Sequence, residues 1–181
     1  MRGDWRAAVN LDDPYGDRLH RELGIRCVGY SLMNSEADFC ACVKKVSVEG
    51  MDVEIKTPDL KNPTERKFPL LGVYNVMNAL QALSLSWTLG IGCEAALEGL
   101  VKMRQVPGRL ERYLIEESGT CVIDFAHNPD GLEKILTALR TICEGKLTVV
   151  FGASGESDIS KRPLMGETAS IIADQVIISS D

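Results

Sequence analysis

The chain has 181 residues, and a domain of typical size has about 150, so one full domain or two incomplete ones are expected. Its 20 Lys and Arg against 26 Asp and Glu give a net charge of −6 and a pI of about 5.0. This balance argues against a nucleic-acid binder, which needs a basic field or stripe. Hydrophobic residues at 45% and charged residues at 25% argue against a disordered chain.

The six cysteines do not form a metal-binding pattern. The sequence has no C-x-x-C pair and two histidines, whereas structural zinc sites use four Cys or His ligands at short spacings. We therefore expect no metal site. Reduced cysteines that pack as small core hydrophobes in a cytoplasmic protein are expected instead. They are Cys27, Cys40, Cys42, Cys93, Cys121 and Cys143.

The distribution of hydrophobic residues does not indicate a membrane protein. The first residues are polar and do not resemble a secretory signal. Residues 68–93 contain no charged side chain, but glycines interrupt them and polar residues recur at helical spacing. The segment therefore predicts a buried amphipathic helix rather than a membrane span.

The first part of the chain combines short strands with three helices. Asp13 and Pro14 are signals for the start of a helix over residues 15–23, which Gly24 ends. Glu49-Gly50 is expected to be a tight turn between strands, and residues 58–67 a polar loop that leads to a strand near Phe68. Strands are expected at 7–11, 25–32, 38–48 and 51–57, and two further helices at 76–89 and 93–103.

The pattern changes after Val106-Pro107-Gly108, which marks the expected domain boundary between residues 1–106 and 107–181. Strands then alternate with helices, which predicts an α/β fold with a β-α-β-α-β parallel sheet covered by helices. The expected strands are 110–116, 121–125, 146–151 and 175–179, the expected helices 129–142 and 163–172, and Ser118-Gly119 a turn.

The strongest candidate site lies where the second of these strands ends, at Asp124-Phe125-Ala126-His127-Asn128-Pro129-Asp130. Loops at the carboxyl ends of parallel strands hold ligands in doubly wound sheets. Asp124 can accept hydrogen bonds from ribose hydroxyls, and His127 with the helix amides can face phosphate. The alternative is that Asn128 only caps the helix and His127 is a surface residue.

Four further segments carry weaker signals. The small-residue loop 152–155 is not a G-x-x-x-x-G-K-[ST] phosphate loop, and the chain contains no such motif. Lys161 and Arg162 precede a helix and oppose its dipole, which indicates an anion or a solvated turn. Asn75 and Asn78 share a helix face and can read a base edge or cap the helix. Arg109 can clamp phosphate or ribose, or is a surface residue beside a turn.

The order of these segments resembles the Mur ligase family, and within it the MurE branch most closely. The resemblance covers nearly the whole chain. The matching segments are Asn10-Leu11-Asp12-Asp13-Pro14, Gly72-x-x-Asn75-x-x-Asn78-Ala79, Pro107-Gly108-Arg109-Leu110-Glu111, Asp124 to Glu133, and Lys161-Arg162-Pro163-Leu164-Met165-Gly166.

The resemblance implies a fragment. Residues 1–106 correspond to the later part of the central, ATP-binding domain, a mixed sheet plus helices. Residues 107–181 correspond to the first half of the Rossmann-like C-terminal domain. The family joins amino acids to carboxylates with ATP in an ADP-forming reaction through an acyl phosphate, in cytoplasmic peptidoglycan synthesis. The phosphate loop and the magnesium-binding lysine have no counterpart here, so the fragment alone is expected to be inactive.

The family's site residues carry over one by one. By resemblance, Asn75 and Asn78 contact the adenine of ATP, Arg109 and Asp124 contact the nucleotide with Asp124 on ribose, and His127 lies near the phosphates. Lys161 and Arg162 match a basic pair beside the cleft. The resemblance assigns no catalytic residue and no metal ligand to this chain, although the full enzyme uses ATP and Mg²⁺.

The same resemblance implies that the full enzyme is a monomer acting on UDP-MurNAc-dipeptide and a (di)amino acid. Three positions depart from the family pattern, namely Phe125, Asn128 and Ser157. Many MurE sequences have an arginine at the position of Ser157, which contacts the incoming amino acid, so the amino acid added is left open. Two alternatives remain: a related ligase of the folylpolyglutamate or cyanophycin type, and a non-catalytic nucleotide-binding module.

Overall fold

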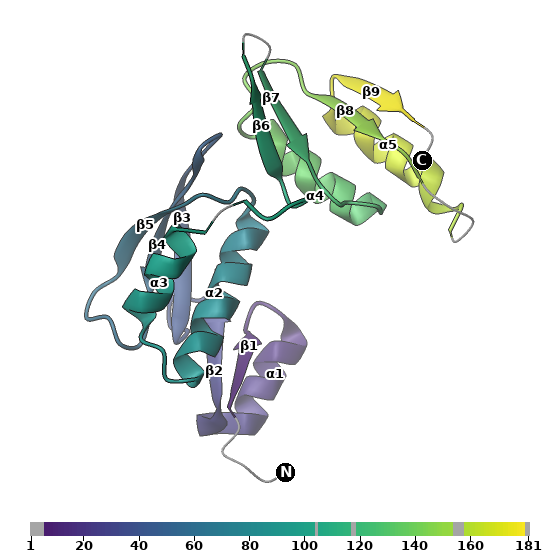
Figure 1. The fold of residues 1–181 in the computed structure, drawn as a ribbon. Helices are drawn as coiled ribbons and strands as arrows, with labels where there is room; N and C mark the ends of the chain where they lie inside the picture. The colour runs from purple at the N-terminus through teal and green to yellow at the C-terminus, as the bar shows by residue number, and fades with distance from the viewer. Residues whose placement is uncertain (1–5, 104, 117–118, 154–157, 180–181) are drawn as a thin grey trace. The chain divides into compact units, whose positions relative to one another are not determined.

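The computed structural model describes residues 6–103, 105–116, 119–153 and 158–179. The chain divides into two compact units, Met1–Arg104 and Gln105–Asp181 (Figure 1). The division falls beside the Val106-Pro107-Gly108 segment, where proline and glycine interrupt the helical pattern. Each unit has its own hydrophobic core.

The first unit is built on a mixed five-stranded sheet with the order β1-β2-β3-β4-β5. Strands β1, β2 and β3 pair in parallel, and β3, β4 and β5 pair antiparallel. Their bounds are β1 Ala7–Asn10, β2 Cys27–Ser31, β3 Phe39–Ser47, β4 Gly50–Lys56 and β5 Thr64–Phe68. The mixed sheet with helices that the sequence predicted is therefore present.

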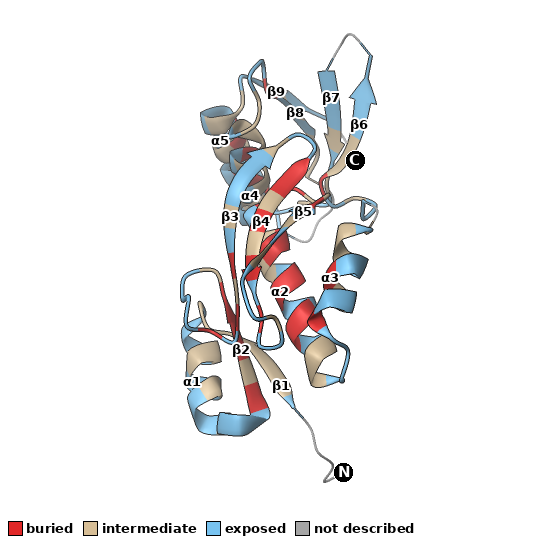
Figure 2. Ribbon diagram, turned by 90° about the vertical axis from the view of Figure 1, so that its left-hand side faces the viewer, coloured by how far each residue is buried: buried red, intermediate tan, exposed pale blue. Residues whose placement is uncertain are grey.

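Helices cover both faces of this sheet. Helix α1 (Pro14–Leu23) lies on one face, and α2 (Val73–Thr88) and α3 (Cys93–Val101) lie on the other (Figure 2). The helical face that the spacing predicted is buried: Val76, Leu80 and Leu83 are at most 1% exposed. They pack in one cluster with Phe39 and Ile55 of the sheet. None of the helices in the described ranges is long and apolar enough to cross a membrane.

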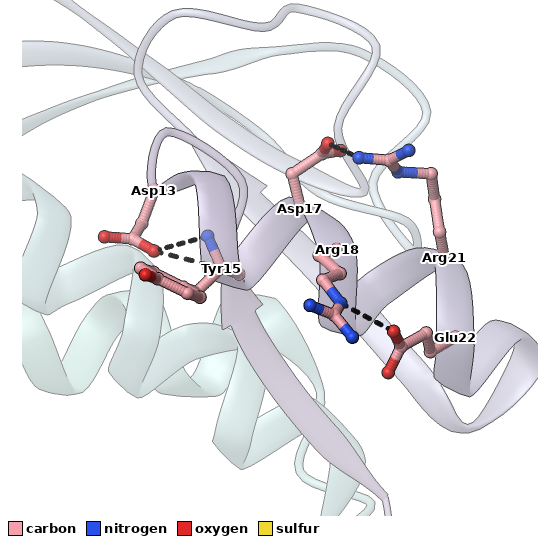
Figure 3. Close-up of polar contacts among 7 residues, drawn as sticks. Asp13, Tyr15, Asp17, Arg18, Arg21 and Glu22 are labelled. Carbon is pink, nitrogen blue, oxygen red and sulfur yellow. Dashed lines mark hydrogen bonds and ion pairs between the residues drawn. The ribbon is translucent and has the colours of Figure 1, made fainter.

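Local sequence signals determine where α1 begins and ends. The Asp13 carboxylate accepts hydrogen bonds from the backbone N–H groups of Tyr15 and Gly16, at 2.8 and 3.2 Å (Figure 3). These bonds satisfy donors that the first turn leaves open. Gly24 ends the helix with a φ of 55°, a left-handed conformation that glycine adopts without strain.

Strand β5 corrects the loop expected over residues 58–67. Thr64 to Phe68 pair with Met51 to Ile55 of β4, so the loop is shorter than expected. Glu65 and Lys67 are exposed to solvent and Phe68 is buried. Strand β5 is at the edge of the sheet, where charged side chains are common. The tight turn also lies one residue earlier than expected, over Val48 and Glu49.

The cysteines are all free, as expected, but they are not all core residues. Cys27 and Cys93 are buried and fit the expectation, whereas Cys42 and Cys121 are exposed. The expectation was wrong for these two because an apolar run does not reveal which strand face a helix covers. Residues on the uncovered face stay in contact with solvent.

In its described residues the second unit contains two strand pairs and two helices. Strands β8 and β9 pair in parallel, as the alternation predicted. The prediction of a single β-α-β-α-β parallel sheet was wrong for β7, because β7 pairs antiparallel with β6 in a separate two-stranded sheet. Leu132 and Leu136 of α4 pack with Met165 and Ala169 of α5 in the core. The bounds are β6 Glu111–Ile115, β7 Gly119–Ile123, α4 Pro129–Arg140, β8 Thr148–Phe151, α5 Lys161–Ile172 and β9 Gln175–Ile178.

Helix α3 is capped from a distant loop. Its N-cap residue Gly92 has no side chain to offer, and the Asp59 carboxylate accepts the backbone N–H of Cys93 at 2.9 Å. The Thr57 hydroxyl donates to the other Asp59 oxygen at 3.1 Å. Burial alone would raise the pKa of Asp59, but the hydrogen bonds from Cys93 and Thr57 lower it. Burial, followed by Asp59, raises the pKa of the Cys93 thiol to about 12.

We expect Asp59→Ala to lower the free energy of unfolding of the first unit by about 1 kcal/mol, because the cap on α3 is lost. Urea denaturation followed by tryptophan fluorescence measures this, since Trp87 lies in α2 of the first unit. Glu98→Ala, on the exposed face of α3, is the matched control and should change stability by no more than about 0.5 kcal/mol.

The same aspartate predicts a dependence on pH. Its pKa is lower in the folded than in the unfolded chain, so its contribution to stability is present above the unfolded value of about 3.9 and is lost as the pH falls through the folded value. Asp59→Asn should therefore lose less stability than the wild type on acidification from pH 6 to pH 3. Equal losses in the two proteins would contradict this assignment.

Candidate nucleotide site

Two segments that are separate in the sequence meet where β7 ends. The backbone N–H of Phe125 donates to the Gly108 carbonyl at 2.9 Å. The backbone N–H of Leu110 donates to the Asp124 carboxylate at 2.8 Å. These two bonds bring together Arg109 and Asp124, which the sequence singled out independently.

The loop before β6 has a tightly determined backbone. The N–H of Arg109 donates to the Val106 carbonyl at 3.0 Å, which closes a turn with Pro107 second and Gly108 third. Gly108 has a φ of 66°, the conformation that makes glycine favoured at this place in a type II turn. Leu110 also has a positive φ, 46°, although its side chain is only 3% exposed. Such a conformation strains a leucine by roughly 1–2 kcal/mol, and the surrounding contacts must maintain it.

Asp124 fixes this loop with its side chain. One carboxylate oxygen accepts the Leu110 N–H and the other accepts the Ala126 N–H, each at 2.8 Å. An ionised carboxylate has about four acceptor positions, so each oxygen can accept a further bond from a ligand hydroxyl. Asp124 is thus a structural residue that retains free acceptor positions.

Three side chains form an exposed stack beside Asp124. The Arg109 guanidinium carbon lies 5.5 Å from the centre of the Phe125 ring, within the range of a cation–π contact. The Phe125 and His127 rings are 5.5 Å apart in an edge-to-face arrangement, and Phe125 is 65% exposed. His127 Nδ1 lies 3.2 Å from the Phe125 carbonyl oxygen. That oxygen can only accept, so Nδ1 carries the proton in this contact.

The start of α4 agrees with the capping alternative for Asn128. Its side-chain oxygen accepts the Gly131 N–H at 2.7 Å, and Pro129 occupies the first helical position. The cap uses the Gly131 amide, and proline has no N–H to donate. This helix start therefore offers a phosphate fewer free amides than the sequence suggested, and Arg109 remains as the group at the end of β7 suited to an anion.

Asn75 and Asn78 lie at the start of α2 in the first unit, where they form a connected pair. Asn75 is buried and donates from its side-chain amide to the Leu71 carbonyl at 2.6 Å. Its side-chain oxygen accepts from the Asn78 amide at 3.2 Å. Helix α2 begins after Gly72, which is the N-cap, so the capping role considered for Asn75 is wrong. It orients Asn78, whose side chain is accessible to a ligand.

The basic pair of the second unit begins α5. Lys161 and Arg162 are the first two residues of the helix, which starts two residues earlier than the sequence predicted. The Ser160 hydroxyl donates a hydrogen bond to the Asp158 carboxylate at 2.6 Å. This bond lowers the pKa of Asp158, and the positive charge of Lys161 lowers it further by a smaller amount. A carboxylate beside the helix start offsets the unfavourable position of the cations. Ser157 and the Ser154-Gly155 part of the small-residue loop lie outside the described residues.

The sequence interpretation missed the structural residues around this site. Leu110 and Glu111 were part of a motif but carried no assigned role, and Phe125 was noted only as a departure from a family pattern. A signal was present in the case of Glu111, since residues two apart in a strand face the same side. That spacing places Glu111 beside Tyr113.

Comparison with known proteins agrees with this arrangement. Residues 108–181 match the family model "Mur ligase, glutamate ligase domain". The whole chain is 42% identical over 183 aligned residues to UDP-N-acetylmuramoyl-L-alanyl-D-glutamate--2,6-diaminopimelate ligase of Synechococcus elongatus. It is also 37% identical, over 97% of its length, to the Clostridium acetobutylicum protein named UDP-N-acetylmuramoyl-L-alanyl-D-glutamate--2,6-diaminopimelate ligase 1. In both cases the chain spans about a third of the length of the relative, 36%.

Solved structures show the same relationship. A structure of a UDP-N-acetylmuramoyl-L-alanyl-D-glutamate--2,6-diaminopimelate ligase superposes with a TM-score of 0.70 at 30% identity, over 97% of this chain and 37% of that one. MurF from Acinetobacter baumannii superposes with a TM-score of 0.78 at 18% identity, over 97% and 38% of the two chains, and shows the fold alone. The chain is therefore similar to Mur ligases over nearly its whole length, and its second unit matches a Mur ligase domain model. Within that family, the relatives cited at 37% identity and above are 2,6-diaminopimelate ligases.

We expect Asp124→Ala to expose the amides of Leu110 and Ala126, because both lose their acceptor. An unpaired buried N–H costs about 1–3 kcal/mol, so the amide of the strained Leu110 should exchange with solvent at least about tenfold faster. Hydrogen exchange followed by NMR measures both amides. Asp130→Ala, which removes only the exposed pair with Lys134, is the control and should leave the Leu110 amide unchanged.

Proposed function

We propose that this chain is part of an ATP-dependent, ADP-forming amide-bond ligase of peptidoglycan precursor synthesis. The full enzyme would add a diamino acid to UDP-MurNAc-L-Ala-D-Glu: ATP phosphorylates the substrate carboxylate, and the amine of the incoming amino acid then attacks the acyl phosphate. The observation that carries this proposal is the convergence of Arg109, Asp124 and His127 in the matched segment. The relatives named for this reaction, at 37–42% identity, support it.

In this proposal the two units are parts of two larger domains. Residues 1–106 would be the later part of the central, ATP-binding domain, and residues 107–181 the first part of the C-terminal domain. The family match, which begins at residue 108, supports the second assignment. The superposition over 97% of the chain on a solved diaminopimelate ligase supports the first.

The described residues suit ATP in three respects. Arg109 supplies a fixed cation for phosphate oxygens, and Asp124 retains acceptor positions for ribose hydroxyls. Asn78 presents an amide that Asn75 holds in place, which suits the edge of adenine. His127 would lie near the phosphates. When bound, Mg²⁺ neutralises charge on the phosphate oxygens, and we assign its ligands to parts of the full enzyme outside this chain.

The site for the incoming amino acid would involve Lys161, Arg162 and Ser157. A guanidinium binds a carboxylate through two parallel hydrogen bonds, which a serine hydroxyl cannot do. The names of the relatives favour 2,6-diaminopimelate as the amino acid, and Ser157 makes this the assignment most in need of a test. The remaining parts of the proposal are a monomeric enzyme and a location in the cytoplasm, where ATP is available.

A graft tests the proposed activity. The aligned segment of the Synechococcus elongatus ligase is replaced by this chain, and the chimera is assayed for ligation with UDP-MurNAc-dipeptide, ATP and either diaminopimelate or lysine. We expect ligation in the chimera and none from the 181 residues alone. In the chimera, Arg109→Ala should lower kcat/KM by at least about tenfold, since a hydrogen-bonded charge contact contributes about 1.5–3 kcal/mol.

Two controls make the result interpretable. Glu116→Ala changes an exposed charge on the same segment and should leave kcat/KM within about twofold, as expected of surface positions. A chimera that folds and binds ATP but forms no product with either amino acid would overturn the ligase assignment and favour a non-catalytic nucleotide-binding module. Product with glutamyl-folate substrates instead would favour the folylpolyglutamate branch.

A further inference from the structure

The loop that carries Arg109 is held from two sides by carboxylates. Asp124 accepts the Leu110 N–H from the β7 side. Glu111, the first residue of β6, accepts the Gly108 N–H at 2.9 Å through Oε2. Arg109 therefore lies between two residues whose backbone N–H groups are both bound to fixed anionic side chains.

Glu111 is itself fixed by its neighbour on the strand. Its other oxygen, Oε1, accepts the Tyr113 hydroxyl at 2.6 Å. Residues 111 and 113 face the same side of β6 because side chains alternate along a strand. The Tyr113 hydroxyl, followed by the Gly108 N–H, lowers the pKa of Glu111, so the carboxylate is ionised at neutral pH and forms strong charge-assisted hydrogen bonds.

The backbone between these carboxylates is strained. Leu110 has a φ of 46° with its side chain buried, a conformation that persists only where surrounding contacts enforce it. Arg109 is the residue next to Leu110, so a change in the Leu110 angles would change the position of the arginine relative to the Phe125 ring. The geometry of the stack therefore depends on the bonds that hold Gly108 and Leu110.

We propose that Glu111 is a positioning residue that, with Tyr113, holds the strained turn and thereby places the Arg109 guanidinium over Phe125 for nucleotide binding. Glu111 does not contact the nucleotide in this proposal; it acts through Arg109. The inference rests on the proposed function for its role in binding, whereas the placement of Arg109 is a property of this chain alone.

The placement is tested first, without any nucleotide. A guanidinium over an aromatic face experiences the ring current, so the Arg109 Hε resonance of the 181-residue chain should be shifted upfield. Phe125→Leu supplies the unshifted reference. We expect Glu111→Ala to move the resonance to the reference position, and Glu116→Ala to leave it at the wild-type position. Glu111→Gln keeps one neutral acceptor oxygen and should give an intermediate shift, which provides a second variant if Glu111→Ala does not fold.

The role in binding is tested by a double-mutant cycle in the grafted ligase, with the KM for ATP as readout. Arg109→Ala and Glu111→Ala should each raise this KM by about tenfold. The double variant should be no worse than Arg109→Ala, because Glu111 acts only through the arginine. A purely structural role would give additive effects in the cycle and would refute the proposal.

The two experiments separate this inference from the proposed function. If Arg109→Ala leaves the KM for ATP unchanged, the nucleotide assignment of Arg109 fails, and the resonance of the isolated chain still decides whether Glu111 places Arg109. A wild-type Arg109 resonance in Glu111→Ala overturns the positioning role whatever the kinetics show.

Discussion

Aspartate side chains that accept backbone N–H groups from other segments hold this fold together. Asp38 binds the Gly29 N–H, Asp59 binds Cys93 and Asp174 binds Leu147, at 2.7 to 2.9 Å. Gly29 lies inside β2, Cys93 begins α3 and Leu147 precedes β8. Leaving such a backbone N–H unpaired costs about 1–3 kcal/mol when it is buried. The candidate site uses the same interaction, since Asp124 binds the Leu110 N–H at 2.8 Å.

This constraint explains why binding and structure are combined in the same residues. Asp124, for which we propose a ribose contact, also fixes the loops on both sides of it through its two oxygens. Asn75 has a comparable double role in the first unit, where it ties the start of α2 to Leu71 and orients Asn78. In both places a buried or half-buried polar side chain determines where an exposed one points.

The interpretation from sequence succeeded where the signal is local. The start of α1 at Asp13 and Pro14, the buried face of α2 and the Asn128 cap all depend on residues within about one helical turn of each other, so spacing alone reveals them. It was wrong for β5, because Thr64 to Lys67 are polar and form a strand only through pairing with β4. It was also wrong for the exposed Cys42 and Cys121, since burial depends on which face a helix covers.

By itself the sequence determined the class of fold, the order of the elements and the resemblance to Mur ligases, because periodicity, capping residues and motif order are written in adjacent residues. It also singled out Arg109, Asp124 and His127 as candidate nucleotide contacts. Only the tertiary structure decided that these three meet at the end of β7 and that Asp124 holds the Arg109 loop. Only the tertiary structure showed that Glu111 and Tyr113 lock a strained turn. The physical reason is that these contacts join residues brought together by strand pairing and loop closure, which local sequence patterns do not encode.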